Sequence, residues 1–124
     1  MQNRIRKQIE DSVAIKQKLL NDQAVLSGIE KTSAALVRAF RDNHKVFLAG
    51  NGGSAADAQH IAAEFVSRFN FDRPGLPALA LTTDTSILTA VGNDYGYDQV
   101  FSRQLAGIGR AGDVAVGIST DGTR

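Results

Sequence analysis

Cysteine is absent from this sequence of 124 residues. The chain can therefore form neither disulfide bonds nor thiolate metal sites, and its composition indicates no oxidising compartment. No apolar stretch approaches the length that crosses a bilayer. The segment Met1–Lys7 is polar and charged, unlike the apolar core of a secretion signal. We therefore expect a cytoplasmic protein without a membrane partner.

The sequence also lacks an excess of either positive or negative charge. Fourteen Lys and Arg residues face thirteen Asp and Glu residues, which leaves a formal net charge of +1. No run of like charge is long enough to predict a nucleic-acid or anionic-membrane surface, so we expect a small-molecule ligand. With 43% hydrophobic and 22% charged residues, the composition is typical of one globular domain.

The first third of the chain predicts two amphipathic helices. Ile5, Ile9, Val13 and Leu20 recur at helical spacing, which predicts a helix over residues 3–20. Asp22 can cap a second helix that reaches residue 40. The apolar face of that helix carries Leu26, Ile29, Leu36, Val37 and Phe40.

The remaining residues alternate between apolar strands and helices. Strands are expected at 45–49, 76–83 and 113–119, helices at 55–69, 84–91 and 98–108, and a turn at 93–96. Such alternation is typical of an α/β fold with a doubly wound parallel sheet. We interpret residues 1–124 as one domain, with N-terminal helices over 1–43 and a partial sheet over 44–124.

Ligands bind such sheets at the carboxyl ends of the strands, and all three ends carry polar groups. They are Gly50-Asn-Gly-Gly-Ser54, Thr82-Thr83-Asp84 and Ser119-Thr120-Asp121-Gly122. A glycine turn before a helix lets backbone N–H groups approach an anion, and Ser54 adds a hydroxyl. Phosphate fits this pattern. The same residues also fit a plain tight turn followed by a helix cap.

A dinucleotide site is a second interpretation of the glycine turn. Gly50, Gly52 and Ala55 fit the spacing of the dinucleotide fingerprint, and Asp84 ends the second strand. The acid lies well beyond the spacing of about 20 residues that ribose recognition requires. We therefore favour phosphate.

His60, Glu64 and Arg68 follow one another at steps of four and project from one helix face. A carboxylate beside a sugar can move a proton between adjacent carbons, and a histidine one turn away can hold a divalent metal or orient that carboxylate. The alternative is an exposed strip with an ordinary Glu–Arg helix pair. One His and one Glu are at most half of a tetrahedral zinc site.

Several motifs together resemble those of the bacterial phosphoheptose isomerases. They are Gly50–His60, Ala63-Glu64, Arg68, Leu81–Asp84, Gly92–Gly96 and Phe101–Arg103. The resemblance implies the sugar isomerase (SIS) fold, with a flavodoxin-like strand order of 2-1-3-4-5. It implies conversion of sedoheptulose 7-phosphate into glycero-manno-heptose 7-phosphate for lipopolysaccharide and related glycans. It also implies a homotetramer whose assembly surface includes the N-terminal helices and whose active sites lie between subunits.

The resemblance assigns roles to particular residues. Glu64 would be the base that moves a proton between the first two sugar carbons, and His60 with Glu64 would contribute to a zinc site. The substrate pocket would be lined by Asn51, Gly52, Gly53, Ser54, Asp94, Ser119 and Thr120. The hydroxyl groups would hold the phosphate and Asp94 the sugar, with Asp84 supporting the pocket wall.

The chain departs from the family pattern near residue 121. Asp121-Gly-Thr-Arg124 stands where the family has Ser-Gly-Asn-Ser. A carboxylate ~5 Å from a phosphate costs on the order of 3 kcal/mol per unit charge at an effective dielectric of ~20, an effect that Arg124 can partly offset.

The family also continues beyond this point, through two more strands with a histidine and a glutamine that complete the zinc site. We therefore expect the last strands of the sheet to be missing from this chain. The third strand would then be an apolar open edge, and stability would be low.

Two functions of other classes are compatible with the same fold. One is a non-catalytic SIS protein of the type that associates with the bacterial replication initiator. The other is a sugar-phosphate sensor that binds its ligand without turnover. The presence of both His60 and Glu64 favours the isomerase, because a pure binding protein needs neither.

Overall fold

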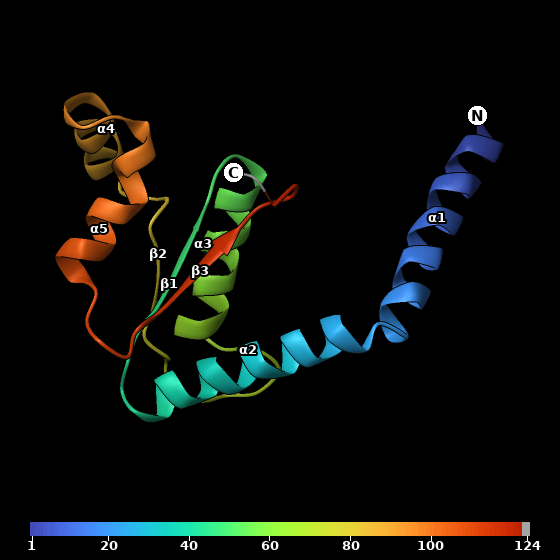
Figure 1. The fold of residues 1–124 in the computed structure, drawn as a ribbon, viewed down its shortest axis with the longest axis horizontal. Coiled ribbons are helices and arrows are strands. Elements are labelled where there is room, and N and C mark those ends of the chain that lie inside the picture. The colour runs from blue at the N-terminus through green and yellow to red at the C-terminus, as the bar shows by residue number, and fades with distance from the viewer. Residues whose placement is uncertain (123–124) are drawn as a thin grey trace. The chain divides into compact units, whose positions relative to one another are not determined.

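A computed structural model describes residues 1–122 and contains five α-helices, one short 3-10 helix and three strands within that range (Figure 1). The helices are α1 (Gln2–Leu20), α2 (Gln23–Arg41), α3 (Gly53–Val66), α4 (Thr85–Asp94), η1 (Tyr97–Gln99) and α5 (Val100–Ile108). The strands are β1 (Val46–Gly50), β2 (Ala78–Ala80) and β3 (Val114–Ile118). The predicted order of helices and strands is confirmed.

Residues Met1–Ala35 form one compact unit, and a second unit begins at Leu36, within α2. In the first unit, the predicted apolar stripe of α1 is exposed to solvent, with Ile5 52%, Ile9 60% and Val13 48% exposed. Asp22 begins α2 as predicted, since its Oδ1 accepts hydrogen bonds from the backbone N–H groups of Ala24 and Val25 at 3.1 Å.

The sheet of the second unit is parallel, with the order β2-β1-β3. Val46 at the start of β1 pairs with Ala78 on one side and Val114 on the other. This order matches the first three positions of the expected 2-1-3-4-5 arrangement. The predicted α/β fold with a parallel sheet is confirmed.

Helix α3 packs on one face of the sheet, mainly against β1 and β2. The buried core at this contact consists of Val46, Leu48, Ala58, Ala62 and Ala80. Alanines on α3 allow the helix axis to lie close to the strands, which the alanine-rich sequence indicates. Phe47 alternates to the opposite face of β1 and is also buried. The sheet is thus buried on both faces at its central strand.

The turn between β1 and α3 depends on two glycines. A Cβ atom on Gly50 would lie 2.6 Å from the carbonyl oxygen of Ser54 and 2.7 Å from its Cβ. Gly52, the N-cap of α3, has φ of 58°, which a residue with a side chain seldom adopts. The first turn of α3 can therefore fold back against the end of β1 only because these positions lack side chains.

Three predicted boundaries were wrong. Helix α3 ends at Val66 instead of residue 69, because the N–H of Leu76 bonds to the carbonyl of Phe65 at 2.9 Å and draws the next segment across the helix end. Strand β2 has three residues instead of eight. It begins after Pro77, which lacks the N–H that pairing requires, and it ends at Ala80. Helix α4 continues to Asp94, and the predicted turn begins later, at Gly96 with φ of 96°.

Among the helices that the structure describes, none combines the length and the hydropathy that crossing a bilayer requires.

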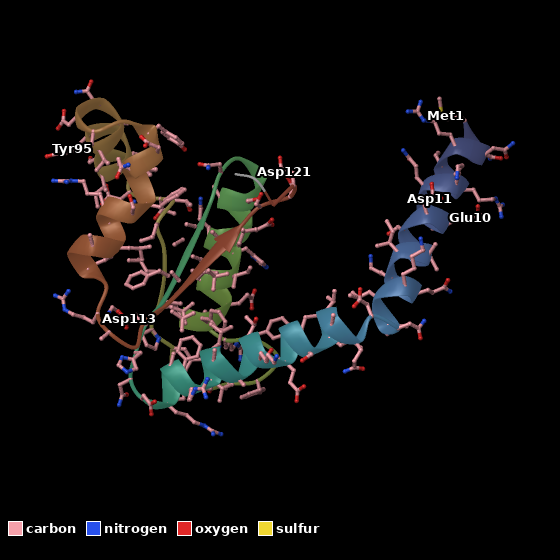
Figure 2. The ribbon with its side chains drawn as sticks, viewed as in Figure 1. Met1, Glu10, Asp11, Tyr95, Asp113 and Asp121 are labelled. Carbon is pink, nitrogen blue, oxygen red and sulfur yellow. The ribbon has the colours of Figure 1, made fainter. Side chains whose placement is uncertain are left out.

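The Asp113 side chain links the residues that directly precede β1 and β3. Its Oδ1 accepts the backbone N–H of Lys45 at 2.8 Å, its Oδ2 accepts the N–H of Arg110 at 2.8 Å, and the Lys45 ammonium lies 3.0 Å from Oδ2. Figure 2 labels Asp113 at this end of β3. The hydrogen bonds and the charge from Lys45, together with the Arg110 N–H, lower the pKa of Asp113 from 3.8 to about 2.

Stability should therefore depend on pH through Asp113. The folded-state pKa lies below the unfolded value, so ionised Asp113 stabilises the fold above about pH 4, and this contribution is lost as the pH falls from about 4 towards 2. Urea unfolding between pH 6 and 2.5 should show a smaller loss of stability for Asp113→Asn than for the unmodified chain. Parallel curves for the two proteins would contradict this account.

Gly50→Ala should lower the free energy of unfolding by about 1–3 kcal/mol, because the added methyl group overlaps Ser54. Gly53→Ala is the matched control, since nothing lies within 4 Å of a Cβ atom there and alanine favours a helix. Urea unfolding of both variants checks the prediction. Equal stability of the two variants would show that the close approach is not a constraint.

Candidate functional site

A cavity of about 240 Å³ lies where β1 and β3 end. Asn51, Gly52 and Ser54 line it from the glycine turn. Ile118, Ser119, Thr120 and Asp121 line it from the end of β3. The parallel pairing of β1 with β3 brings these two segments to the same edge of the sheet, as the sequence predicts. We name this space the anion cavity.

Donors for an anion gather at the glycine turn. The N–H groups of Ser54 and Ala55 bond to the carbonyls of Asn51 and Gly52 at 3.1 Å. Of the described residues, none accepts a hydrogen bond from the N–H of Gly52 or Gly53. These two groups stand at the N-terminal end of α3, where the helix dipole favours negative charge. The side chain of Ser54 is nearly buried beside them.

Asp121 opposes an anion in the same cavity. Its Oδ1 accepts the hydroxyl hydrogen of Ser119 at 3.0 Å, and the Ser119 oxygen accepts the N–H of Gly122 at 3.0 Å. A hydroxyl that donates to Asp121 cannot donate the same hydrogen to a phosphate. An anion in this cavity would therefore meet the negative charge of Asp121 and a Ser119 hydroxyl that already donates to it.

His60 and Glu64 form a pair further along α3. The Nε2 of His60 lies 3.5 Å from the Oε1 of Glu64, with the two side chains 77% and 35% exposed. In a tetrahedral zinc site with bonds of about 2.1 Å, two ligand atoms lie about 3.4 Å apart. The pair therefore fits two ligand positions of such a site. Among the described residues, no third histidine or acidic side chain joins them.

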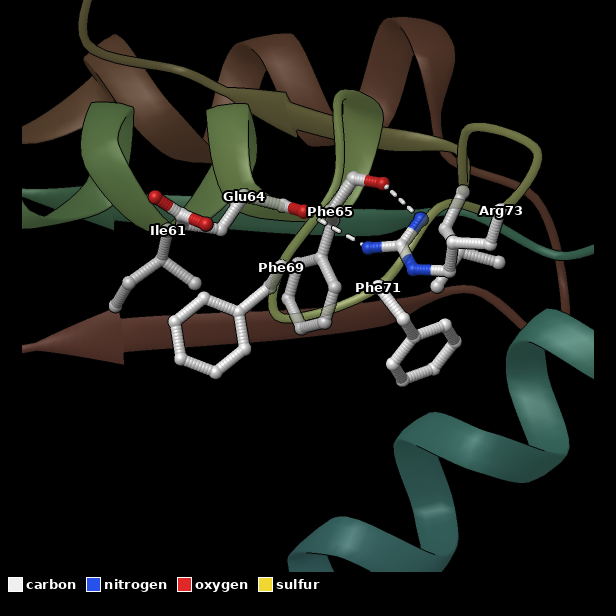
Figure 3. Close-up of a pocket in the computed structure, with 7 residues that line it drawn as sticks. Ile61, Glu64, Phe65, Phe69, Phe71 and Arg73 are labelled. Atoms are coloured by element: carbon white, nitrogen blue, oxygen red, sulfur yellow. Dashed lines mark hydrogen bonds between the residues drawn. The ribbon is translucent and has the colours of Figure 1, made fainter.

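Glu64 also lines a second cavity, of about 400 Å³, whose lining is mostly apolar and includes three phenylalanines (Figure 3). Its other lining residues are Ile61, Phe65, Phe69, Phe71, Arg73 and Leu76. The Arg73 guanidinium donates to the carbonyls of Glu64 and Phe65 at 2.8 Å, as the dashed lines show. Arg73 thus pairs with the Glu64 carbonyl, shares the Phe65 carbonyl with the N–H of Leu76, and fixes the backbone that carries Glu64.

The predicted site residues fall into separate groups. Asn51, Gly52, Ser54, Ser119 and Thr120 lie together around the anion cavity, and Gly53 adjoins it as the first residue of α3. His60 and Glu64 lie further along α3, and the cavity of Glu64 shares no lining residue with the anion cavity.

The remaining sequence-selected residues lie outside both cavities. Asp94 ends α4 and accepts a hydrogen bond from Asn93 at 2.9 Å. Asp84 accepts the N–H of Ile87 and so begins α4 as predicted. Arg68 is exposed beyond the end of α3, and the role of Arg124 falls outside the described residues.

The sequence analysis missed two residues beside these groups. One is Arg73, whose contacts follow from the way the chain reverses after α3. The other is Tyr97, whose hydroxyl donates to Oδ1 of Asn51 at 2.7 Å. Gly96, which turns the chain just before Tyr97, was the only local signal in the sequence.

The sequence pattern of the SIS domain family matches residues 8–124. The chain belongs to the SIS domain family. It is 59% identical over 122 residues to a phosphoheptose isomerase of Sulfurimonas denitrificans, covering 98% of this chain and 63% of the relative. It is 57% identical over 122 residues to the phosphoheptose isomerase of Aneurinibacillus thermoaerophilus, covering 98% of this chain and 62% of the relative.

Solved structures agree with this assignment to the SIS domain family. The phosphoheptose isomerase of Neisseria gonorrhoeae superimposes with a TM-score of 0.84 at 44% identity, over 96% of this chain and 60% of that one. The phosphoheptose isomerase of Francisella tularensis gives a TM-score of 0.87 at 36% identity, over 95% of this chain and 61% of that one. The chain thus spans about three fifths of the length of these relatives.

Replacing Asp121 by asparagine should tighten binding of inorganic phosphate by about tenfold to hundredfold, because one negative charge leaves the cavity while the side-chain size is kept. Asp42→Asn is the matched control, since it removes the same charge from an exposed turn. Isothermal titration at constant ionic strength measures the effect. Equal gains in both variants would mean that only net charge matters.

Proposed function

We propose that this SIS chain acts as an isomerase that converts sedoheptulose 7-phosphate into D-glycero-D-manno-heptose 7-phosphate. Relatives of high identity that carry the name phosphoheptose isomerase support this proposal. The observation that carries it is the arrangement on α3. The helix presents backbone N–H groups at its first turn, and it carries His60 and Glu64 six and ten residues after Ser54.

The reaction needs a base for one proton. In the proposed mechanism, Glu64 removes a proton from C1 of the ketose and leaves an enediolate. A hydroxyl proton then moves from O1 to O2, and Glu64 returns its proton to C2, which gives the aldose. No electron acceptor is required, since the two sugars are isomers. His60 lies within 3.5 Å of Glu64 and can orient its carboxylate. The phosphate in the anion cavity anchors the far end of the substrate.

Zinc is the cofactor that we propose for this site. The spacing of His60 Nε2 and Glu64 Oε1 supports two ligand positions, and the others would come from outside the described residues. A bound zinc ion would polarise the oxygens on C1 and C2 of the sugar.

We further propose that the enzyme is a homo-oligomer, and specifically a homotetramer. Ten helical residues separate Ser54 from Glu64, which is about 15 Å along the axis of α3, and the two side chains line different cavities. Side chains of a second subunit can join these cavities into one site. The exposed apolar stripe of α1 supports a role in subunit contacts.

The proposed product would enter the synthesis of lipopolysaccharide and related heptose-containing glycans. A sugar phosphate carries about 1.5 to 2 negative charges at neutral pH and does not pass a lipid bilayer readily. We therefore propose that the reaction takes place in the cytoplasm.

Glu64→Gln tests the proposed function. The unmodified chain, with zinc present, should isomerise sedoheptulose 7-phosphate or exchange its C1 proton with deuterated water, as seen by NMR. The rate of the variant should be at least about 100-fold lower than that of the unmodified chain. The variant should still bind phosphate, because only the base is removed. Glu30→Gln, an exposed position on α2, is the control. Absence of turnover by the unmodified chain, or unchanged turnover in Glu64→Gln, would contradict the proposal.

A further inference from the structure

Tyr97 joins the segment after α4 to the glycine turn, 46 positions earlier in the chain. Its hydroxyl donates to Oδ1 of Asn51 at 2.7 Å, a distance typical of a good O–H···O hydrogen bond. Among the described residues, this is the one side-chain hydrogen bond between residues 85–99 and the glycine turn. The contact therefore couples η1 directly to a wall of the anion cavity.

The orientation of the Asn51 amide matters because its two edges differ. Oδ1 accepts hydrogen bonds, whereas Nδ2 carries two donors. A phosphate in the cavity is favoured by a donor and opposed by a carbonyl dipole. The Tyr97 hydroxyl donates to Oδ1, and no described residue accepts a hydrogen bond from Nδ2, so the two Nδ2 donors are available to a ligand. Without that hydroxyl, either edge can face the ligand.

The backbone, not burial, places the Tyr97 ring. The side chain is 62% exposed, so packing alone does not fix it. Gly96 turns the chain with φ of 96°, and a Cβ atom there would lie 2.8 Å from Oδ1 of Asp98. Gly92 on α4 lies beside the ring. A Cβ atom at this position would lie 4.0 Å from Tyr97 Cδ2. The positive φ of Gly96 sets the turn from which the Tyr97 hydroxyl reaches Asn51, whereas the contact at Gly92 is an ordinary van der Waals distance.

We propose that Tyr97 is a positioning residue of the anion cavity, whose hydroxyl holds the Asn51 amide with its Nδ2 donors available to the phosphate group of the ligand. This inference rests on the proposed function only in that the cavity takes a phosphate. Tyr97 does not touch the reacting carbons and is not a catalytic residue. Its effect should therefore appear in phosphate affinity and not in proton transfer.

The test is a double-mutant cycle in the full chain, with inorganic phosphate as the probe and isothermal titration as the measurement. Tyr97→Phe should weaken phosphate binding about three- to tenfold, as expected for loss of one oriented hydrogen bond. In an Asn51→Ala background, the same substitution should change affinity less than about twofold, because the amide that it orients is gone.

The second tyrosine of the chain provides a matched control. The hydroxyl of Tyr95 accepts a hydrogen bond from Arg103 at 3.0 Å, and the Arg103 guanidinium carbon lies 3.7 Å from the Tyr95 ring centroid. Tyr95→Phe removes an equivalent hydroxyl two residues away without touching Asn51. It should leave phosphate affinity unchanged.

The Asn51 side-chain N–H₂ signals in ¹⁵N NMR spectra supply an independent readout. They should shift in Tyr97→Phe and stay in place in Tyr95→Phe. Unchanged affinity in Tyr97→Phe, or an equal loss with and without Asn51, would overturn the inference and leave the proposed function intact. Absence of phosphate binding by the unmodified chain would overturn both this inference and the proposed function. Titration of the unmodified chain alone therefore separates failure of the inference from failure of the proposed function.

Discussion

The close approach of Gly50 to Ser54 is the constraint on which the rest of the second unit depends. Only a residue without a side chain lets the first turn of α3 fold back onto the end of β1. Once it does, Ala58 and Ala62 can pack on Val46 and Leu48, and the sheet gains its covered face. The same approach places the N–H groups of Gly52 and Gly53 at the edge of the sheet, beside the end of β3. Core packing and the proposed anion site thus share one structural requirement.

Helix α3 carries both parts of the proposed active site. Its first turn offers dipole and N–H groups to a phosphate, and its last turns carry His60 and Glu64. Arg73 caps the end of the helix by bonding to the carbonyls of Glu64 and Phe65, the second of which also accepts the N–H of Leu76. The proposed anion site relies on backbone N–H groups with a fixed geometry, whereas the Glu64 carboxylate lies near the exposed rings of Phe69 and Phe71. This contrast is consistent with a site that a second subunit completes.

Local sequence signals predicted much of this fold, because helix caps, glycine turns and apolar periodicity act over short distances. Asp22 and Asp84 begin their helices as expected, and the parallel order follows from the alternation of elements. The end of α3 was missed because it depends on Arg73 and Leu76 crossing the helix terminus. The Tyr97–Asn51 hydrogen bond was missed because it joins positions that lie 46 residues apart in the chain and meet only in the folded protein. The pairing of Ser119 with Asp121 needed coordinates, although the charge of Asp121 was visible in the sequence.

The central claim is that the glycine turn and the end of β3 bind a phosphate group. Titration of the ¹⁵N-labelled chain with inorganic phosphate, followed by backbone NMR, tests it most directly. Our account predicts that the largest and saturable shifts belong to the amides of Gly52, Gly53 and Thr120, which adjoin the anion cavity. Shifts confined to the Lys and Arg residues of α1 and α2, with those three amides unmoved, would contradict it.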